Sequence, residues 1–302
     1  MISVFLSASV LSDDQLKEFI SKKLDLINNV QVCLGRNGDI ILIPTDFPRS
    51  ILSVLYAFSV ADYVLFYVGS EINSLSAELA LCVENSNINE GYCVINDYSD
   101  INSFDKFFLN YRIGRFKKVK TSQEINYKKE VEKSGLKYVS IDKHFIVKGI
   151  GSVIIGFVIG DTVSKGDRLF LLPSLKQCSV KSIQIMDVDS TSAEKGSHVG
   201  LSLNNISESD LSSNYAVSSS NSVYSEFTVA LKVSDFYKED MFAKQLSCAV
   251  FGETFSVNLV KDDDKVKIKF NRPVPKLSGR YLLLDPSLSI GRNRVVGSFE
   301  IA

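Results

Sequence analysis

The sequence predicts an α/β unit followed by two antiparallel β-barrels, and three observations point to this combination. Residues 1–114 alternate short apolar runs with amphipathic helical stretches, which is typical of a mostly parallel sheet covered by helices. From residue 139 onward, short β-branched runs follow one another, broken by Gly, Asp, Asn and Ser. Between them lies the basic segment 115–138, which holds eight basic and three acidic residues and which we interpret as a linker.

The first unit begins with a strand at Ile2–Leu6, because this short apolar run suits a buried position. Ser12 is expected to cap a helix, with acidic residues in its first turn. The apolar face of that helix would carry Leu16, Phe19, Ile20 and Leu24. Asn37-Gly38 predicts a hairpin turn between two strands. The remaining elements expected here are helix 49–61, strand 63–68, helix 74–83, strand 92–95 and helix 104–111.

The second half reads as β structure throughout. Strand-like runs are expected at 145–147, 153–158, 169–172, 180–185 and 199–203. The serine-rich stretch Ser218–Ser222 marks a boundary between barrels at 139–218 and 219–302. The glycines from Gly149 to Gly156 resemble a dinucleotide loop only superficially, and we interpret them as bends in a barrel.

Composition excludes several classes of protein. The chain has 302 residues, 45% of them hydrophobic and 23% charged, so wholesale disorder is excluded. The 34 basic and 35 acidic residues argue against a generally basic nucleic-acid coat, and we expect no DNA partner. The segment 115–138 is compatible with a solvated connector, with a partly helical stretch at 124–132, or with a contact for RNA phosphates.

Metal, disulfide and membrane signals are weak. The five cysteines are widely separated and only two histidines occur, so we expect free thiols and no metal site. The apolar run Ile51–Val68 contains Asp62 and is better explained by a helix followed by a strand than by a membrane span. The first ten residues lack the features of a signal peptide. We therefore expect a cytoplasmic protein without a membrane partner.

Phosphate-binding and catalytic motifs are missing. The pattern GxxxxGK[ST] occurs nowhere, and Ser7–Asp13, which follows the first strand, contains neither glycine nor lysine. No Ser/His/Asp set has persuasive spacing, so we predict no catalytic residues.

The stretch Val139–Ala216 resembles domain II of translational GTPases. The resemblance begins at Ser140-Ile141-Asp142-Lys143-His144-Phe145-Ile146-Val147-Lys148-Gly149 and continues through Lys165-Gly166-Asp167 and Ala193–Leu203. This order is similar to that of the elongation factor Tu family, especially its selenocysteine-specific branch. Arg294-Val295-Val296-Gly297-Ser298 resembles the end of domain III in the same branch.

The resemblance implies that residues 1–114 are a truncated, degenerate P-loop GTPase domain. Ile43–Phe47 lies near the family's Asp-x-Pro-Gly motif without reproducing it, and in the guanine-reading motif Asn96 is kept but Asp97 replaces lysine. We therefore expect a pseudo-GTPase that binds neither GTP nor magnesium, and not an enzyme. The alternative is a nucleotide-dependent, GTP-binding elongation factor of the selenocysteine-specific type with an atypical site.

The resemblance also implies where a partner would bind. Asp142, Phe145 and His198 fall where the family's domain II lines the pocket for the aminoacyl end of tRNA, although Phe145 could instead be core and His198 a strand end. Candidate contacts for RNA phosphates are Arg115, Lys117, Lys118, Lys120, Arg292 and Arg294. The expected partner is tRNA, the ribosome or a ribosomal protein; a protein-binding scaffold without RNA is a further alternative. The oligomeric state stays open.

Overall fold

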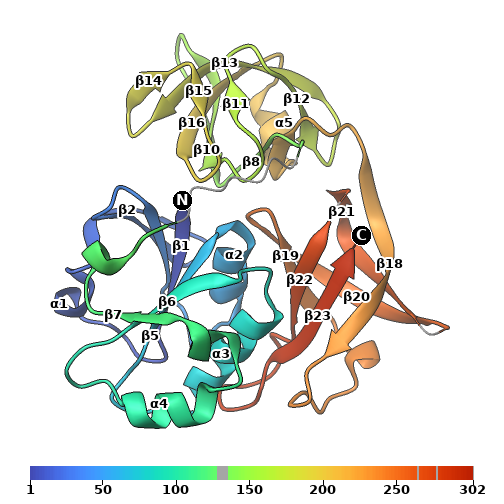
Figure 1. Ribbon diagram of the computed structural model, residues 1–302. Helices are drawn as coiled ribbons and strands as arrows, with labels where there is room; N and C mark the ends of the chain where they lie inside the picture. Colours follow the sequence, from blue (N-terminus) through green and yellow to red (C-terminus); the bar gives the residue numbers. More distant parts are fainter. Residues whose placement is uncertain (128–134, 264, 277, 302) are drawn as a thin grey trace.

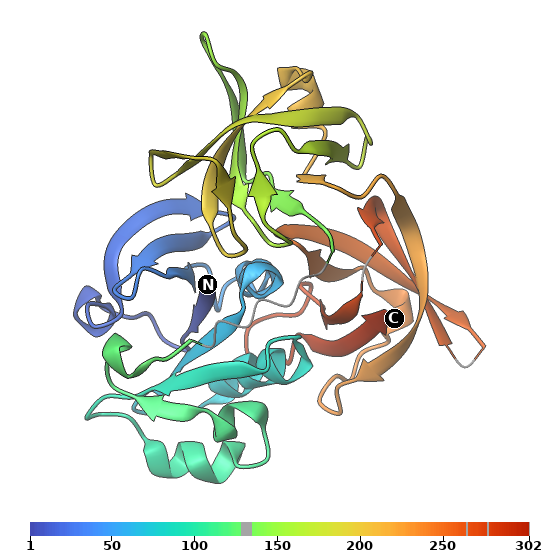
Figure 2. The same ribbon diagram turned by 45° about the horizontal axis from the view of Figure 1, so that its top comes forward.

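The computed structural model describes residues 1–127, 135–263, 265–276 and 278–301. It contains three units, which we name the α/β unit (residues 1–127), the central β unit (residues 135–218) and the C-terminal barrel (residues 223–301). Figures 1 and 2 show the central β unit above the other two, with the C-terminal barrel beside the α/β unit. The predicted combination of a mixed α/β part with β-barrel structure is confirmed.

The α/β unit is built on one sheet, with seven strands among the described residues in the order β2-β3-β4-β1-β5-β6-β7. The strands are β1 (Ile2–Leu6), β2 (Ile20–Ile27), β3 (Val30–Gly35), β4 (Ile40–Pro44), β5 (Tyr63–Tyr67), β6 (Glu90–Val94) and β7 (Lys117–Val119). From β4 to β7 the neighbours run parallel, whereas β2 and β3 are antiparallel additions. All five residues of β1 are buried, as expected for a central strand covered on both faces.

The helices cover the two faces unequally. The helices are α1 (Asp13–Leu16), α2 (Leu52–Val60), α3 (Ser74–Asn85), α4 (Ile101–Phe108) and the short turns η1 (Arg112–Arg115) and η2 (Ser122–Glu124). α2, α3 and α4 share a core with the sheet residues Val4, Val64 and Phe66. The opposite face, with Phe5 and Leu65, is covered by α1 and by the segment that ends at Tyr127. Within the described residues, every helix is too short or too polar to cross a bilayer.

The predicted helix from Ser12 to Leu24 is wrong beyond its first turn. Ser12 does cap α1 in a capping box with Gln15, but the helix ends at Leu16. The chain then turns into β2, which pairs with β3 in a ladder with two irregularities. The Phe19 ring packs edge-on against Phe5 at 5.6 Å between centroids, so its apolar surface is buried without a helix. Sheet pairing therefore overrides the helical spacing.

The predicted linker at 115–138 is partly sheet. Lys117–Val119 forms β7 at the edge of the sheet, and Val119 is buried beside β6. Tyr127 covers the α1 face, where its hydroxyl donates to the Asp39 carboxylate at 2.6 Å and its ring meets Tyr63 at 4.8 Å. The α/β unit thus extends to Tyr127, because the last parallel strand and the cover of one face lie in the basic segment. The helix considered at 124–132 is not seen at 125–127, and its remainder lies outside the described residues.

The central β unit is a curled antiparallel sheet. Its main strands are β8 (Tyr138–Ser140), β9 (Lys143–Val147), β10 (Gly151–Phe157), β12 (Arg168–Leu172), β13 (Gln177–Ile185), β16 (His198–Asn204) and β17 (Ala216–Ser218). The smaller elements are β11 (Val163–Ser164), β14 (Val188–Ser190), β15 (Ser192–Ala193) and α5 (Glu208–Ser212). One antiparallel bridge, Val139 to Val158, joins the first strand of the sheet to the end of β10. The barrel is thus closed by a bridge and not by a full ladder.

The C-terminal barrel is closed, in the order β18-β21-β20-β19-β22-β23. Its elements are β18 (Val223–Val233), η3 (Met241–Ala243), β19 (Leu246–Val250), β20 (Glu253–Asp262), β21 (Lys265–Pro275), β22 (Gly279–Leu284) and β23 (Val295–Ile301). Its outer residues Leu282, Leu284 and Val295 belong to the same buried cluster as α2 and α3. The barrel therefore packs on the helices of the α/β unit.

The backbone of Gly156 packs so closely on the backbone of Ser140 that no side chain fits between them. Replacement of Gly156 with alanine is therefore expected to destabilise the protein. A Cβ at Gly156 would lie 1.9 Å from the carbonyl oxygen of Ser140, so backbone must shift. We expect Gly156→Ala to lower the free energy of unfolding by about 2–3 kcal/mol in urea denaturation, as other overpacked sites do. Gly200 on the neighbouring strand β16 is the matched control, because an added Cβ there meets nothing within 4 Å. Equal effects of the two substitutions would show that the close approach carries no energy.

Candidate functional site

The edge of a parallel sheet at the carboxyl ends of its strands is where α/β proteins of this type bind ligands. In this chain the segment Ser7–Ser12 follows β1 at that edge. It leads into α1, which has only four residues, and it offers neither a glycine backbone nor a lysine. A phosphate cradle needs glycine amides and a long helix with a free N-terminus. Neither is present in the described loop between β1 and α1.

Side chains at the same edge bind one another. The Tyr67 hydroxyl, at the end of β5, accepts hydrogen bonds from Gln15 Nε2 at 2.8 Å and Asn96 Nδ2 at 2.7 Å. Asn96 Oδ1 accepts from the backbone N–H of Tyr98 at 2.9 Å. Tyr67 is 7% exposed, and its ring belongs to the buried cluster that contains Leu16 and Val94. The amide of Asn96, the expected counterpart of a guanine-reading asparagine, is therefore hydrogen-bonded within the protein. Sequence reasoning missed Gln15 and Tyr67, which no motif marks.

Asp142 lies at the contact between the central β unit and α2. The Tyr56 hydroxyl donates to Asp142 Oδ1 at 3.0 Å, and Oδ2 is buried without a hydrogen-bond partner. The residue as a whole is partly exposed, but its carboxylate is not. Burial raises the pKa of Asp142 to about 7, against the lowering effect of the bond from Tyr56. Asp142 therefore links two units instead of facing an open pocket.

His198 stands on the same side of the central β unit. Its ring lies 4.7 Å from the Phe157 ring, and its Nε2 is buried without a partner. Burial lowers the pKa of His198, while the Asp25 carboxylate opposes this and the Lys143 ammonium adds to it. Asp25, on β2, is held by Lys143 at 2.5 Å. The structure thus places His198 and Asp142 near one interunit ion pair, which the sequence did not indicate.

Phe145 lies on β9 (Lys143–Val147), the strand that also carries Lys143. It sits two positions beyond Lys143 on β9, and its side chain is 39% exposed. It is therefore not a core residue. An exposed aromatic ring on an edge strand can stack on a base or on another ring.

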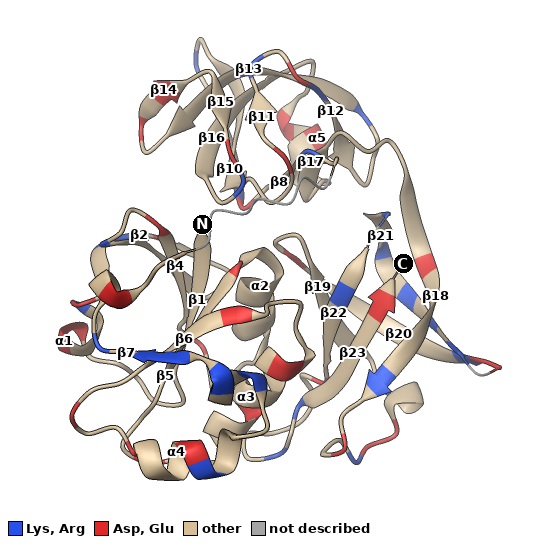
Figure 3. Cartoon of the chain, viewed as in Figure 1, with Lys and Arg blue, Asp and Glu red and all other residues tan. Residues whose placement is uncertain are grey.

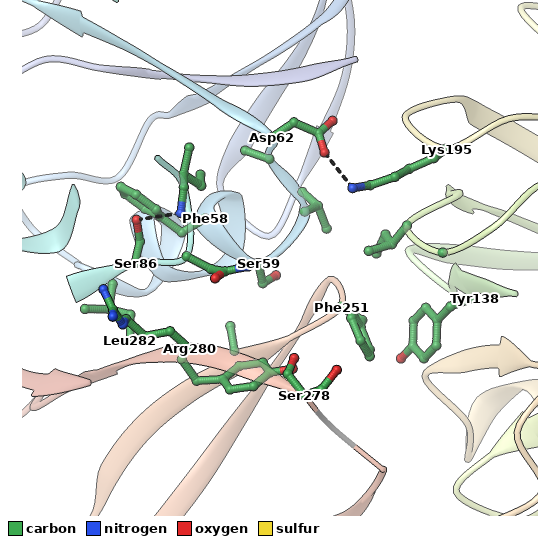
Figure 4. Close-up of a pocket in the computed structure, with 18 of the residues that line it drawn as sticks. Phe58, Ser59, Asp62, Ser86, Tyr138, Lys195, Phe251, Ser278, Arg280 and Leu282 are labelled. Atoms are coloured by element: carbon green, nitrogen blue, oxygen red, sulfur yellow. Dashed lines mark hydrogen bonds and ion pairs between the residues drawn. The ribbon is translucent and has the colours of Figure 1, made fainter. Parts of the chain in front are cut away.

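A cavity of about 920 Å³ opens where the three units meet. Figure 4 shows Asp62 and Lys195 joined across it, with Phe251 and Tyr138 at one side and Arg280 at another. Lys195 pairs with Asp62 at 3.0 Å, and Arg280 pairs with Glu300 at 2.6 Å. The Tyr138 hydroxyl is buried without a partner. The charges that line the cavity are thus largely neutralised within the chain.

Five of the six basic candidates divide into two groups. Lys118 pairs with Asp105 at 2.7 Å, Lys120 pairs with Asp97 at 2.8 Å, and Arg292 pairs with Glu239. Arg115 and Lys117 are exposed, and no ion pair joins them to the described residues. Figure 3 shows the basic residues of β7 and η1 next to α3.

The prediction that Arg294 contacts RNA phosphate is wrong. Arg294 is 2% exposed, and its guanidinium forms a two-pronged ion pair with Glu78 of α3, with Nε to Oε1 at 2.9 Å and Nη2 to Oε2 at 2.5 Å. Its Nη1 also donates to the carbonyl oxygen of Pro48 at 2.8 Å. A guanidinium that is enclosed in this way cannot reach a ligand. Arg294 instead fastens the C-terminal barrel to the α/β unit, and Glu78 is the partner that the sequence did not reveal.

Metal ligands and reactive thiols are not grouped. Among the described residues, no set of three or more His, Cys, Asp or Glu side chains could hold a metal ion. All five cysteines are free and buried, and burial raises the pKa of Cys33 and Cys178 to about 11.

Comparison with known proteins connects this architecture with translation factors. No protein-family model matches the chain. An uncharacterized protein of Methanocaldococcus jannaschii is 30% identical over 174 residues, which is 56% of this chain and 56% of that protein. The selenocysteine-specific elongation factor of the same organism is 30% identical over 107 residues, or 34% of this chain and 23% of that factor. The chain thus matches about half or less of the length of these curated relatives.

Solved structures show the same fold over the whole chain. The elongation factor SelB from Methanococcus maripaludis, solved in complex with the GTP analogue GPPNHP, superposes with a TM-score of 0.75. The match has 15% sequence identity and covers 99% of this chain and 78% of that one. The arrangement of an α/β unit and two β units is therefore the fold of this kind of factor.

Proposed function

Because the chain shares the fold of selenocysteine-specific elongation factors and resembles them in sequence, we propose that it is an elongation factor-like protein that works without GTP. It binds a component of the translation machinery, which is tRNA, the ribosome or a ribosomal protein. It acts as a binding protein and a pseudo-GTPase, without a nucleotide or magnesium cofactor.

The sheet edge beyond β1, β5 and β6 carries this proposal. Phosphoryl transfer depends on a phosphate cradle, a bound magnesium ion and a positioned water. Here a four-residue helix follows β1, and the Tyr67 hydroxyl is hydrogen-bonded to Gln15 and Asn96. An acid, Asp13, begins the helix where a phosphate would be repelled. These features support the loss of nucleotide binding.

The contacts between the units support one fixed arrangement. The ion pairs Lys143–Asp25 and Lys195–Asp62 join the central β unit to the α/β unit. The ion pair Arg294–Glu78 joins the C-terminal barrel to the α/β unit. The backbone N–H of Gly252 also donates to Ser59 Oγ at 2.9 Å. A nucleotide can shift a domain arrangement only through contacts that differ between two states. We propose that this protein keeps its arrangement, and that its partner meets a preformed surface.

Nucleotide titration tests the proposal. We expect no saturable binding of a fluorescent GTP analogue at micromolar protein with magnesium present, and no release of phosphate from GTP. Labelled bulk tRNA and purified ribosomes are tested in parallel, and binding to at least one of them is expected. Micromolar GTP affinity with turnover, or no binding to any translation component, would contradict the proposal.

A nucleotide-dependent elongation factor is the second candidate. It is favoured by Asn96, which stands at the end of β6 where a guanine-reading asparagine is expected. Nucleotide binding would then require Asn96 Nδ2 to leave the Tyr67 hydroxyl. The same titration separates the two candidates.

A further inference from the structure

A groove of about 470 Å³ lies on the α/β unit, at the amino end of β6 and β7 and away from the sheet edge described above. Its lining comes from the start of β6 and from η1 and β7, and consists of Asn89, Glu90, Gly91, Tyr92, Arg112, Arg115, Phe116 and Lys117. Gly91 lets the Phe116 ring pack closely on the start of β6, because a Cβ there would come within 2.4 Å of that ring. The groove is thus a shaped part of the fold.

The groove gathers positive charge. Arg115 and Lys117 are exposed at its rim, whereas the next two lysines along the chain, Lys118 and Lys120, are neutralised by Asp105 and Asp97. Residues 1–114 carry 7 basic and 14 acidic side chains, so this concentration of cations stands against an acidic background. Glu90, at the rim, has an interaction partner within the chain.

Arg112 forms a rigid cationic floor. Its Nη1 donates to the carbonyl oxygens of Val83 at 2.9 Å, Ser86 at 3.1 Å and Ile88 at 2.6 Å, which end α3 and the turn after it. Burial lowers the pKa of Arg112, the nearby Glu84 carboxylate opposes this, and the charges of Arg280 and Arg115 lower it further. Arg112, with Glu84 as its acidic neighbour, thus lies in the same lining as Arg115 and Lys117, and three cations in one groove attract an anion.

We propose that this groove binds the phosphate backbone of an RNA segment, with Arg115 and Lys117 as the contacting residues. The inference rests on the proposed function and deepens it, because it places an RNA contact on the α/β unit instead of the central β unit. Arg115 is suited to bidentate phosphate binding, and Lys117 to a point contact. Tyr92 lies in the same lining.

The experiment compares two double variants that lose the same charge. R115Q/K117Q removes the two unpaired cations, and K118Q/K120Q removes the two paired ones. Fluorescence anisotropy with labelled bulk tRNA, at several salt concentrations, measures affinity for the full chain. We expect R115Q/K117Q to bind about tenfold or more weakly and to reduce the slope of log K against log salt by roughly 2. K118Q/K120Q is expected to change affinity less than about threefold.

Other outcomes distinguish failure of the groove inference from failure of the proposed function. If the wild type binds tRNA and R115Q/K117Q binds equally well, or if both double variants lose the same affinity, the groove inference is overturned while the proposed function stands. If the wild type binds neither tRNA nor ribosomes, both are overturned. An acidic polyglutamate peptide is the third arm; preferential binding of this peptide, lost in R115Q/K117Q, would overturn RNA as the occupant. Thermal unfolding of both variants, whose four altered side chains are exposed or partly exposed, checks that the fold is kept.

Discussion

Replacing Glu78 with glutamine is expected to lower the free energy of unfolding by about 3–5 kcal/mol, because it leaves the Arg294 guanidinium buried without a counter-charge. Both residues are almost fully enclosed, with 5% and 2% of their surface exposed. Glu78 accepts from the Arg294 backbone N–H as well as from Nε and Nη2, so several hydrogen bonds weaken together. Urea denaturation of the full chain measures the effect.

The matched control is the neighbouring and more exposed pair, Arg292–Glu239, whose side chains are 56% and 26% exposed. Exposed ion pairs contribute about 0–1 kcal/mol, so Glu239→Gln is expected to leave the urea midpoint nearly unchanged. Limited proteolysis offers a second readout, since Glu78→Gln should expose the contact between α3 and the barrel to cleavage before global unfolding. Indistinguishable midpoints for the two variants would mean that the buried pair does not fasten the barrel.

Replacing Asp142 with asparagine is expected to change how stability depends on pH. The folded-state pKa of Asp142 is about 7, because burial disfavours the carboxylate, whereas the unfolded chain has the ordinary value of about 4. Between these values the folded chain holds a proton that the unfolded chain has lost. The contribution of Asp142 to the free energy of unfolding therefore falls by about 1.4 kcal/mol per pH unit as pH rises from about 4 to about 7. Above about pH 7 this contribution no longer changes with pH.

The Asp142→Asn variant keeps an acceptor for the Tyr56 hydroxyl but carries no titrating group. It should lose this part of the pH dependence and be more stable than the wild type above pH 7. The check is the difference in unfolding free energy between the two proteins at pH 5, 6, 7 and 8. A difference that does not grow between pH 5 and 7 would contradict the burial of this carboxyl at the interface.

Local signals predicted most of the secondary structure of the α/β unit. The run Ile2–Leu6 forms β1, Gly38 takes the positive φ of +78° that its hairpin turn needs, and the apolar run that contains Asp62 is a helix followed by a strand. The Asp62 carboxylate accepts a hydrogen bond from the backbone N–H of Ile2 and forms an ion pair with Lys195. The charge that argued against a membrane span thus joins the α/β unit to the central β unit. The predictions that proved wrong concern residues whose contacts come from distant parts of the chain.

The candidate site was only partly predictable. The resemblance placed Asp142 and His198 in a pocket for the aminoacyl end of tRNA, and the structure places both near the Lys143–Asp25 ion pair between two units. Their neighbours Tyr56 and Asp25 belong to the α/β unit, far away in sequence. Arg294 and Lys117 are both cations in basic stretches, yet one is buried and the other exposed. Spacing along the chain carries no information about that difference.

Periodicity and motifs are local properties, so the sequence predicted the order of an α/β unit and two β units, the likeness to elongation factors and the absence of the pattern GxxxxGK[ST]. The packing of distant segments made β7 and Tyr127 part of the first unit, and it bonded the Tyr67 hydroxyl to Gln15 and Asn96. It also buried Arg294 against Glu78, where it joins the barrel to the α/β unit. Burial and pairing depend on which distant segments meet. The free-energy cost of burying a charged side chain depends on the partners that distant segments supply, and not on its neighbours in sequence.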